Sequence, residues 1–414
     1  MTVVRNQQRT LLRLLAALRP FWRRDPALPT RVQSLLASHR EFGSRDRRLY
    51  RELIYTTLRH LPWIEPLLDA QPDEATRRLA WLAADLPATR TFRTMFATGE
   101  PPSGDRTELL PAWFRPHCPE LFEEPELGTQ LRRAPLWLRL QVDAAGESDV
   151  FREFESRNWS WRRSPALASA VELLTEADVT TSEAWRRGAF EVQDLGSQLI
   201  LAAVGVEAGG SWLDACAGAG GKTLQLAQLL GRSGRVDAHD IRASALRELA
   251  ARAARAGIAC RPADASVSRG AAEHSSAPGA RFASIRILRD SPAGEYDGVL
   301  VDAPCSGSGT WRRAPHLKWV TSEARISVAS VRQRALLHQF SACVRPGGRL
   351  VYATCSLSRF ENEEVVAAFL SDHPDFQVEP LAATFGAAVL HGGLTLFPSQ
   401  HDSDGFFVAS LRRR

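Results

Sequence analysis

Hydrophobic residues in the first part of the chain recur every three or four positions, above all in residues 11–18 and 49–61, and arginines fill many of the positions between them. This period gathers the apolar side chains on one face of each helix and leaves the basic ones outside. We therefore predict an all-helical domain over residues 1–98. Its basic faces suit either a structural appendage or an RNA-binding domain, and the pattern alone does not decide between them.

A stretch rich in turn-forming residues, Gly99-Glu-Pro-Pro-Ser-Gly-Asp105, interrupts the helical pattern, and we assign residues 99–134 to a linker and connecting segment. Strand-like alternation in residues 136–141 and a helical pattern in residues 148–157 then predict a small α+β unit over residues 135–190. Trp159 and Trp161 in this unit could stack on bases, but tryptophans two apart on a strand more often pack against a core.

From residue 191 onward, apolar strands and amphipathic helices alternate. The pattern predicts helices over residues 195–204, 222–230 and 243–256, strands over residues 211–215, 235–240, 296–301 and 348–353, and a Ser/Ala/Gly-rich loop over residues 266–280. Such alternation builds a parallel, doubly wound sheet. The predicted fold class is therefore α/β, with a Rossmann-like domain over residues 191–414.

A glycine-rich turn, Asp214-Ala-Cys-Ala-Gly-Ala-Gly-Gly-Lys-Thr223, joins the first of these strands to a helix. The Walker phosphate loop would need glycine in place of Cys216, and the dinucleotide pattern would need it in place of Thr223. Asp240 ends the next strand, where a carboxylate can accept both hydroxyls of a ribose. A ligand with a ribose and no pyrophosphate fits this combination best, and we expect S-adenosylmethionine.

The composition limits the classes of protein to which the chain can belong, but it does not indicate a function. The chain has 414 residues, of which 44% are hydrophobic and 24% charged, as is ordinary for a soluble protein. Its net charge of +5 is carried almost wholly by arginine, which suits nucleic-acid contact and a solvated surface equally. The six cysteines form no C-x-x-C pair, so we expect no metal site and reduced thiols in the cytoplasm. No apolar run is long enough to cross a membrane. Among the oligomeric states, a monomer is favoured.

Two cysteines stand directly after strands of the predicted sheet, in Asp302-Ala-Pro-Cys305 and Thr354-Cys355-Ser356. Side chains just beyond the carboxyl ends of parallel strands face one crevice, so we expect Cys305 and Cys355 to meet beside the methyl donor. Asn-Pro-Pro-Tyr, typical of enzymes that methylate exocyclic nitrogens, is absent there. A thiolate that adds to carbon 6 of cytosine makes carbon 5 nucleophilic, and Asp302 could donate a proton or hydrogen bond toward N3.

Three segments carry a resemblance to a known family: Asp214-x-Cys-Ala-Gly-x-Gly-Gly-Lys-Thr223, Asp302-Ala-Pro-Cys-Ser-Gly-Ser-Gly-Thr-Trp-Arg-Arg-x-Pro315 and Tyr352-Ala-Thr-Cys-Ser-Leu-x-x-x-Glu-Asn-Glu363. Together with Val192-Gln-Asp and the closing Asp404-Gly-Phe-Phe, they look like the RNA 5-methylcytosine methyltransferases of the RsmB/NOL/NSUN family. A helical start, a mixed middle unit and a catalytic end follow in the same order as in the small-subunit ribosomal RNA enzymes of that family.

The resemblance implies S-adenosylmethionine as cofactor and ribosomal RNA as substrate, with transfer RNA as the alternative. It implies Cys355 as the nucleophile, Cys305 as the residue that helps to release the product, and Asp302 as a contact to the cytosine edge. Asp240 and Asp264 would bind the ribose and adenine of the cofactor. The other implied cofactor contacts are Asp214, Cys216, Ala217, Gly218, Gly220, Gly221, Lys222 and Asp302. Lys222 would also lie close to the reacting centre. A cysteine in the position of Cys216 more often packs in the core than takes part in the reaction.

Some features depart from the family pattern, and other classes of protein stay open. Gly218-Ala219 stands where Ala-Pro is usual, His316 stands where an acidic residue is usual, and the loop after Asp264 is longer. A catalytically silent RNA-binding protein could keep this fold, although such decay is expected to erase one of the two cysteines. A DNA cytosine methyltransferase would use Cys305 as its nucleophile and needs no Thr-Cys-Ser segment.

Overall fold

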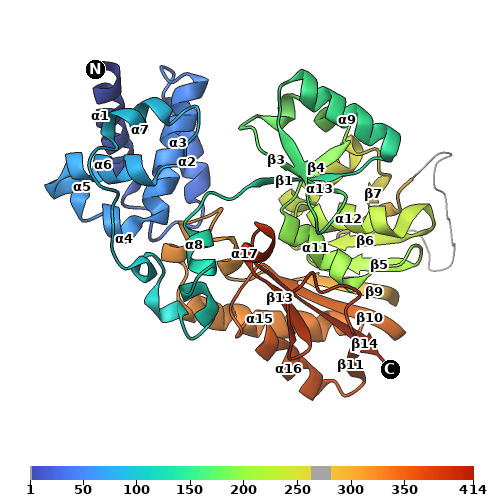
Figure 1. The fold of residues 1–414 in the computed structure, drawn as a ribbon. Coiled ribbons are helices and arrows are strands. Elements are labelled where there is room, and N and C mark those ends of the chain that lie inside the picture. The colour runs from blue at the N-terminus through green and yellow to red at the C-terminus, as the bar shows by residue number, and fades with distance from the viewer. Residues whose placement is uncertain (1, 263–280) are drawn as a thin grey trace. The chain divides into compact units, whose positions relative to one another are not determined.

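Figure 1 shows the computed structural model of the chain, which describes residues 2–262 and 281–414. The chain divides into two compact units. Met1–Ala134 and Thr310–Arg325 form the first, and Pro135–Gly309 and Ile326–Arg414 form the second. The first unit therefore includes a segment, Thr310–Arg325, that lies far along the chain from the rest of it.

The first unit is helical, as the hydrophobic pattern predicts. Its α-helices are α1 (Thr2–Leu18), α2 (Leu28–Ser38), α3 (Ser44–Arg59), α4 (Leu61–Ile64), α5 (Leu67–Ala70), α6 (Pro72–Leu82), α7 (Arg90–Phe96), α8 (Glu126–Gln130) and α14 (Leu317–Val320). Leu11, Leu15 and Leu53 from the predicted apolar faces are buried in one core. Burying a leucine stabilises the fold by about 1.5–3 kcal/mol, so these faces hold the helices together.

Residues 99–134 differ from the predicted linker. They form short 3-10 helices at Arg106–Leu109, Ala112–Phe114 and Pro119–Phe122 before α8, and they belong to the first unit. The turn-rich composition predicts a loop, but Leu109, Phe114 and Leu121 are fully buried and fix the segment in place. Trp311, which the sequence places in the catalytic domain, packs against Phe114 with ring centroids 4.6 Å apart.

The first part of the second compact unit forms a small α+β arrangement, in which the last strand ends at Val192. An antiparallel sheet in the order β2 (Trp161–Arg163), β3 (Ala170–Leu173), β1 (Leu136–Leu140), β4 (Phe190–Val192) packs with α9 (Ala144–Ser156). Trp161 stacks on Phe151 at 3.9 Å and Trp159 tilts against Phe154 at 5.5 Å. Both tryptophans thus pack in this small core, in agreement with the packing interpretation.

The larger sheet of the second unit has a parallel core with an antiparallel edge. Its parallel strands lie in the order β10 (Val344–Thr354), β9 (Tyr296–Asp302), β5 (Ser211–Asp214), β6 (Arg235–His239), β8 (Ser284–Leu288), β7 (Cys260–Pro262). β14 (Phe406–Arg413) joins β10 antiparallel, followed by β13 (Gly393–Leu396) and β12 (Val389–Leu390), and β11 (Phe376–Val378) also pairs with β14. This is the predicted Rossmann-like arrangement.

The hydrophobic pattern does not predict β8, a strand within the parallel part of this sheet. β8 inserts between β6 and β7, so β7 is an edge strand and does not pair with β6. Ser284-Ile-Arg-Ile-Leu288 is short, and Arg286 interrupts its apolar run. Arg286 is tolerated there because it pairs with Asp237 on β6, a partnership that hydrophobic periodicity does not reveal.

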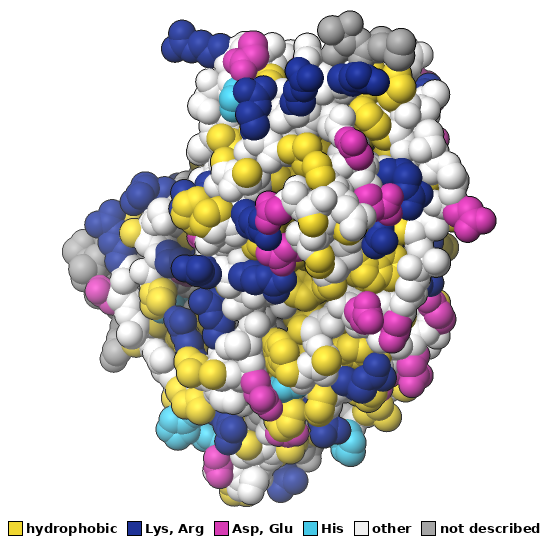
Figure 2. Space-filling model, turned by 90° about the vertical axis from the view of Figure 1, so that its left-hand side faces the viewer, with side chains coloured by type: hydrophobic (Ala, Val, Ile, Leu, Met, Phe, Trp, Pro, Cys, Tyr) yellow, Lys and Arg dark blue, Asp and Glu magenta, His cyan; other side chains and the backbone are white. Residues whose placement is uncertain are grey.

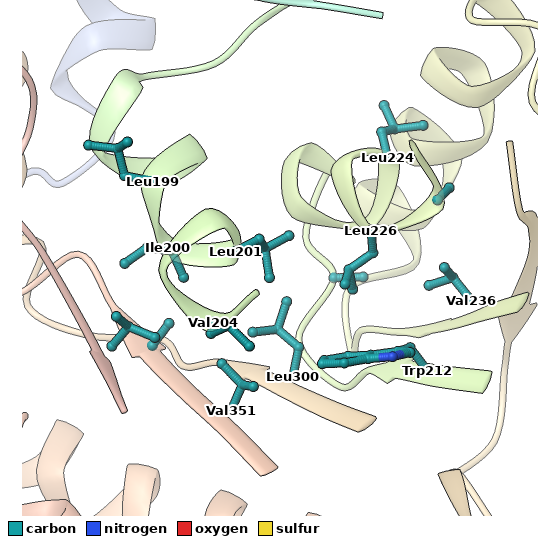
Figure 3. Packing of buried hydrophobic residues seen from close by; sticks show 14 of the residues in the cluster. Leu199, Ile200, Leu201, Val204, Trp212, Leu224, Leu226, Val236, Leu300 and Val351 are labelled. Carbon is teal, nitrogen blue, oxygen red and sulfur yellow. The ribbon is translucent and has the colours of Figure 1, made fainter. Parts of the chain in front are cut away.

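Helices cover both faces of the large sheet (Figure 1). α11 (Leu195–Val204), α12 (Gly221–Leu230) and α13 (Ala243–Arg255) lie on one face, and α15 (Glu323–Ser341) and α16 (Glu363–Asp372) lie on the other. Figure 3 shows Leu201 of α11 and Leu226 of α12 on the side of their helices that faces Trp212, Leu300 and Val351 of the strands. Gly298 must be glycine, because a Cβ there would lie 2.3 Å from the Trp212 ring.

The surface shows no single dominant charge on the face drawn in Figure 2. Arginine and lysine side chains are spread over it, with acidic and hydrophobic side chains between them. Across residues 2–262 and 281–414, no helix has both the length and the apolar character needed to span a bilayer.

Candidate functional site

Two thiols meet at the carboxyl ends of neighbouring parallel strands. Cys305 follows β9 and Cys355 follows β10, whose residues Asp302 and Ala353 are paired in register. The two Sγ atoms lie 3.3 Å apart. The convergence expected from the sequence is therefore present, because parallel pairing brings both strand ends to the same edge of the sheet.

Lys222 and Asp302 form an ion pair at the same edge. Lys222 Nζ donates to Asp302 Oδ2 at 2.9 Å, and its side chain is 7% exposed. Burial alone would lower the pKa of Lys222, but the charge and hydrogen bond of Asp302 outweigh it and raise the pKa above its usual value. A negative charge on Cys355 acts in the same direction, so a buried ammonium group faces the thiols.

The two cysteines differ in their surroundings. The hydrogen bond with Cys355 and burial together raise the pKa of Cys305 well above its usual value. Cys305 therefore keeps its proton and can donate its hydrogen bond to Cys355. This division suits one thiol to act as nucleophile while the other serves as a hydrogen-bond donor.

Glu361 links the two cysteine-bearing loops from a fully buried position. Its Oε1 accepts the backbone N–H of Ser306 at 2.8 Å, and its Oε2 accepts the hydroxyl of Ser356 at 2.6 Å. Each serine directly follows one of the cysteines. The sequence motif contains Glu361 but does not indicate its role; the available signal was its place six residues after the candidate nucleophile Cys355.

The glycine-rich turn after β5 requires glycine at two positions. Gly218 and Gly220 have φ values of +54° and +89°, in the left-handed region that glycine favours. A Cβ on Gly220 would also lie 2.6 Å from Leu249 Cγ, whereas one on Gly221 would meet nothing within 4 Å. The turn thus presents Gly221 toward open space at the start of α12, while Ala217 and Cys216 pack into the cores beneath it.

Asp214 is a buried carboxyl at the end of β5. Its Oδ2 accepts the hydroxyl of Thr223 at 2.7 Å, while Oδ1 makes no hydrogen bond of normal geometry with the described part of the chain. Burial raises the pKa of Asp214 to about 7, against the opposing effect of Thr223. A buried oxygen without a partner is a candidate contact for a ligand that carries a hydrogen-bond donor.

Asp240, the predicted ribose contact, already has partners. It accepts the Gly218 N–H at 2.9 Å, and Arg242 reaches both of its oxygens, each at 3.0 Å. Burial would raise the pKa of Asp240, but these hydrogen bonds lower it. A ribose bound there would have to share the carboxylate with Arg242. Asp264, the predicted adenine contact, lies outside the described residues.

S-adenosylmethionine fits the residues that the structure brings together. Oδ1 of Asp214, which makes no hydrogen bond of normal geometry with the described part of the chain, can accept from the amino group of the cofactor. The open space over Gly221 leaves room for the methionine part. Asp240 ends the strand beside the turn, next to Gly218. The cofactor would thus lie along the strand ends that carry Asp302 and the two thiols.

Comparisons with known proteins agree with this geometry. The matching family model is described as 16S rRNA methyltransferase RsmB/F and covers residues 200–412. Ribosomal RNA small subunit methyltransferase B of Xanthomonas campestris pv. campestris is 32% identical over 286 residues, 68% of this chain and 60% of that protein. Ribosomal RNA small subunit methyltransferase F of Serratia proteamaculans is 33% identical over 233 residues, 55% of this chain and 45% of that protein.

The chain thus spans between 45% and 60% of the length of these two curated relatives. Among solved structures, the crystal structure of PH0851 matches over 98% of both chains with a TM-score of 0.72 and 22% sequence identity. At that identity the match shows a shared fold, including both compact units.

Proposed function

Because the chain belongs to the 16S rRNA methyltransferase RsmB/F family, we propose that it methylates carbon 5 of a cytosine in RNA, with S-adenosylmethionine as methyl donor. Ribosomal RNA is the proposed substrate class, from the names of the relatives. The observation that carries the proposal is the pair of thiols 3.3 Å apart beside the Lys222–Asp302 ion pair. Methyl transfer to oxygen or nitrogen needs no such pair of thiols.

Cys355 is the nucleophile in this proposal. Carbon 5 of cytosine attacks poorly because its reaction interrupts the aromatic ring. As a thiolate, Cys355 forms a bond from Sγ to carbon 6, and the electron pair displaced from the ring makes carbon 5 nucleophilic. The protonated Cys305 can donate a hydrogen bond to the Cys355 sulfur, and the charges of Cys355 and the Lys222 ammonium group act on each other.

Asp302 and Lys222 hold the opposite edge of the base. Asp302 accepts from Lys222 through Oδ2, so its other oxygen can accept from the exocyclic amino group of cytosine. The Lys222 ammonium supplies positive charge next to the site where negative charge develops toward N3. In this arrangement Asp302 serves as a hydrogen-bond acceptor, because its Oδ2 already accepts from the Lys222 ammonium group.

Cys305 removes the proton from carbon 5 in the final step. Its raised pKa is caused first by the hydrogen bond with Cys355. Once the Cys355 sulfur is bound to carbon 6, that hydrogen bond and its charge disappear, and the pKa of Cys305 falls. Cys305 then loses its own proton to water, and the resulting thiolate accepts the carbon 5 proton while the bond between Cys355 Sγ and carbon 6 breaks. The electron pair of that bond leaves with Cys355, and the aromatic ring is restored.

When bound, S-adenosylmethionine supplies the methyl group that carbon 5 takes up. Asp214 would hold its amino group, the turn through Gly218, Gly220 and Gly221 its methionine part, and Asp240 its ribose. Cys216 and Ala217 support the turn from the core side.

The proposal is tested by incubating the purified protein with labelled S-adenosylmethionine and RNA or DNA from cells that lack the gene. Label is expected in ribosomal RNA as 5-methylcytosine, and bisulfite sequencing of RNA from cells with and without the gene locates the cytosine. Label in transfer RNA alone would change the substrate class. Label in DNA, or binding of RNA without any transfer of label, would overturn the proposal.

A further inference from the structure

A pocket of about 580 Å³ opens on the helical unit. All of its lining residues come from the described part of Met1–Ala134, so it lies within one compact unit. Trp63 of α4 and Trp81 of α6 form part of its wall, and Arg106 and Arg132 are exposed along it. Its size lies in the range of about 300–1,000 Å³ that is typical of small-ligand sites.

The two tryptophans are held in fixed positions. Trp81 Nε1 donates to the carbonyl of Thr98 at 3.2 Å. The Trp63 ring lies against Gly104, where an added Cβ would come within 3.2 Å of it. Both side chains remain partly exposed and line the pocket. Immobilised indole rings that keep an open surface are suited to stacking with a flat ring, because little side-chain entropy is lost on binding.

The charge around the pocket is positive. Arg106 pairs with Glu124 at 2.7 Å, but Arg132 donates to the Thr129 hydroxyl at 3.1 Å and has no carboxylate partner among the described residues. Burial, followed by the charges of Arg59, Lys318 and Arg106, lowers the pKa of His60 in the pocket wall to about 3. His60 is therefore neutral, and Glu124 balances the charge of Arg106, so the positive charge along the pocket comes from Arg132.

Neutral His60 also offers a hydrogen-bond acceptor. Its Nδ1 lies 3.0 Å from the carbonyl of Thr56 and must donate to it, since a carbonyl oxygen only accepts. The other ring nitrogen, Nε2, then carries a lone pair. The pocket thus combines flat apolar surfaces, an uncharged acceptor and an unpaired guanidinium group.

We propose that this pocket holds an unpaired nucleotide of the RNA substrate, with its base against Trp63 and Trp81 and its phosphate at Arg132. The base edge meets His60. A nucleotide within a duplex cannot enter, because both faces of its base are covered by neighbouring bases, so the site selects single-stranded or looped RNA. This inference rests on the proposed function for the identity of the substrate, while the pocket itself belongs to the helical unit alone.

The test measures binding of a fluorescently labelled oligouridine and of a matched RNA duplex to the full-length protein. Trp81→Ala and Trp63→Ala are each expected to weaken oligouridine binding by about 5- to 150-fold, the range for one lost base-stacking contact, and to leave duplex binding unchanged. Trp81→Phe should retain most of the affinity because it keeps a flat ring. Trp113→Ala, which removes a partly exposed tryptophan of the same unit outside the pocket, is the matched control.

Arg132→Gln keeps the inference testable if the tryptophan variants do not fold, because Arg132 is exposed. It should reduce the slope of log affinity against log salt by about 0.7, the value for one contact to a single-stranded phosphate. Unchanged oligouridine affinity and salt slope in folded variants would overturn the inference, as would equal binding of uridine monophosphate, which would indicate a free-nucleotide site. Absence of methyl transfer by the wild-type protein would instead contradict the proposed function and leave these binding results interpretable.

Discussion

At the scale of single residues, the two thiols should fail in opposite ways when each is removed. Without Cys355 no bond to carbon 6 can form, so Cys355→Ala should neither methylate RNA nor become attached to it. Without Cys305 the adduct forms and carbon 5 accepts its methyl group, but the proton on carbon 5 stays in place. Cys305→Ala should therefore accumulate as a protein–RNA conjugate, seen as a shifted band on a denaturing gel.

Cys260→Ala is the matched control, since Cys260 lies on the edge strand β7 and should retain full activity without a conjugate. A conjugate with Cys355→Ala and none with Cys305→Ala would reverse the two roles. The enzyme would then use the cysteine after β9 as its nucleophile, as a DNA cytosine methyltransferase does.

The raised pKa of Asp214 predicts a pH dependence for cofactor binding. With a pKa of about 7, Asp214 is protonated below that pH and must lose its proton to pair with the amino group of S-adenosylmethionine. Affinity should therefore fall about tenfold for each pH unit below 7, because binding must then release a proton. It should also decline above about pH 8, where an α-amino group loses its own charge.

Calorimetry in buffers of different ionisation enthalpy measures both the affinity and the released proton. The Asp214→Asn side chain cannot titrate, so the affinity of this variant should not fall below pH 7. Its amide oxygen can still accept the hydrogen bond from Thr223. If the affinity of Asp214→Asn fell below pH 7 as it does in the wild-type protein, Asp214 would not be a contact of the cofactor.

Single residues were predictable where one chemical group fixes the role. A cysteine directly after a strand of a parallel sheet must lie at the ligand edge, so the meeting of Cys305 and Cys355 followed from their positions in the sequence. The pairing of Asp240 with Arg242 did not, because Arg242 lies only two residues away in a turn whose backbone geometry the sequence does not specify. The Lys222–Asp302 pair was not predictable either, because it joins residues 80 positions apart in the sequence.

At the scale of elements, Glu361 should act as a positioning residue for both cysteine loops. Glu361→Gln replaces the carboxyl oxygen Oε2 that accepts from the Ser356 hydroxyl with an amide nitrogen that cannot accept. The free energy of unfolding should therefore fall by about 1.5–3 kcal/mol. The methyl-transfer rate should fall as well, while binding of S-adenosylmethionine is retained, because the glycine-rich turn is untouched. Chemical denaturation, single-turnover methylation and calorimetry separate these effects.

Glu364→Gln is the control for this substitution. Glu364 is exposed and its nearest basic partner, Arg359, is 4.0 Å away, so its loss should change stability by no more than about 0.5 kcal/mol. Equal effects of the two substitutions, or a normal transfer rate in Glu361→Gln, would leave Glu361 without a positioning role.

Elements with a strong period were predictable, and those with a polar interruption were not. The helices α11, α12 and α13 and the strands β5, β6, β9 and β10 lie where the alternation of apolar segments predicts them. β8 was missed because Arg286 breaks its pattern, and its partner Asp237 is supplied by another strand. Local periodicity reports burial, but it cannot report which polar residues are paired across a sheet.

At the scale of the whole molecule, the first unit should depend on residues that the sequence assigns to the catalytic domain. Trp319 packs against the helical core, and its Nε1 donates to the carbonyl of Leu58 at 2.7 Å. Trp319→Ala should lower the stability of the helical unit by about 3 kcal/mol, the lower end for loss of a packed tryptophan. Backbone amides of α3 should then exchange hydrogen faster, while those of α12 stay protected.

Hydrogen exchange followed by mass spectrometry measures both helices in one experiment. Val328→Ala, which shortens an exposed side chain on α15, is the control and should alter neither. Faster exchange in α12 rather than α3 would mean that Trp319 stabilises the catalytic unit instead.

The division of the chain into units was the least predictable feature. Gly99-Glu-Pro-Pro-Ser-Gly-Asp105 reads as a boundary because of its turn residues, and nothing local in Thr310–Arg325 marks it as part of a helical unit. Its buried side chains find their partners among the first 134 residues, through contacts such as Lys318 Nζ to the carbonyls of Arg59 and Leu109. Contacts between such distant segments leave no periodic signal in either one.

The return of the chain to its first unit has a consequence for biosynthesis. Residues up to Ala134 leave the ribosome long before Thr310–Arg325, and at about 5–20 residues per second the delay is on the order of 10–40 seconds. During that interval the nascent helices lack the segment that buries Trp311 and Trp319 against them. The amino-terminal part of this protein should therefore be a client of chaperones on the ribosome, and it completes its fold only when translation has passed the catalytic loop.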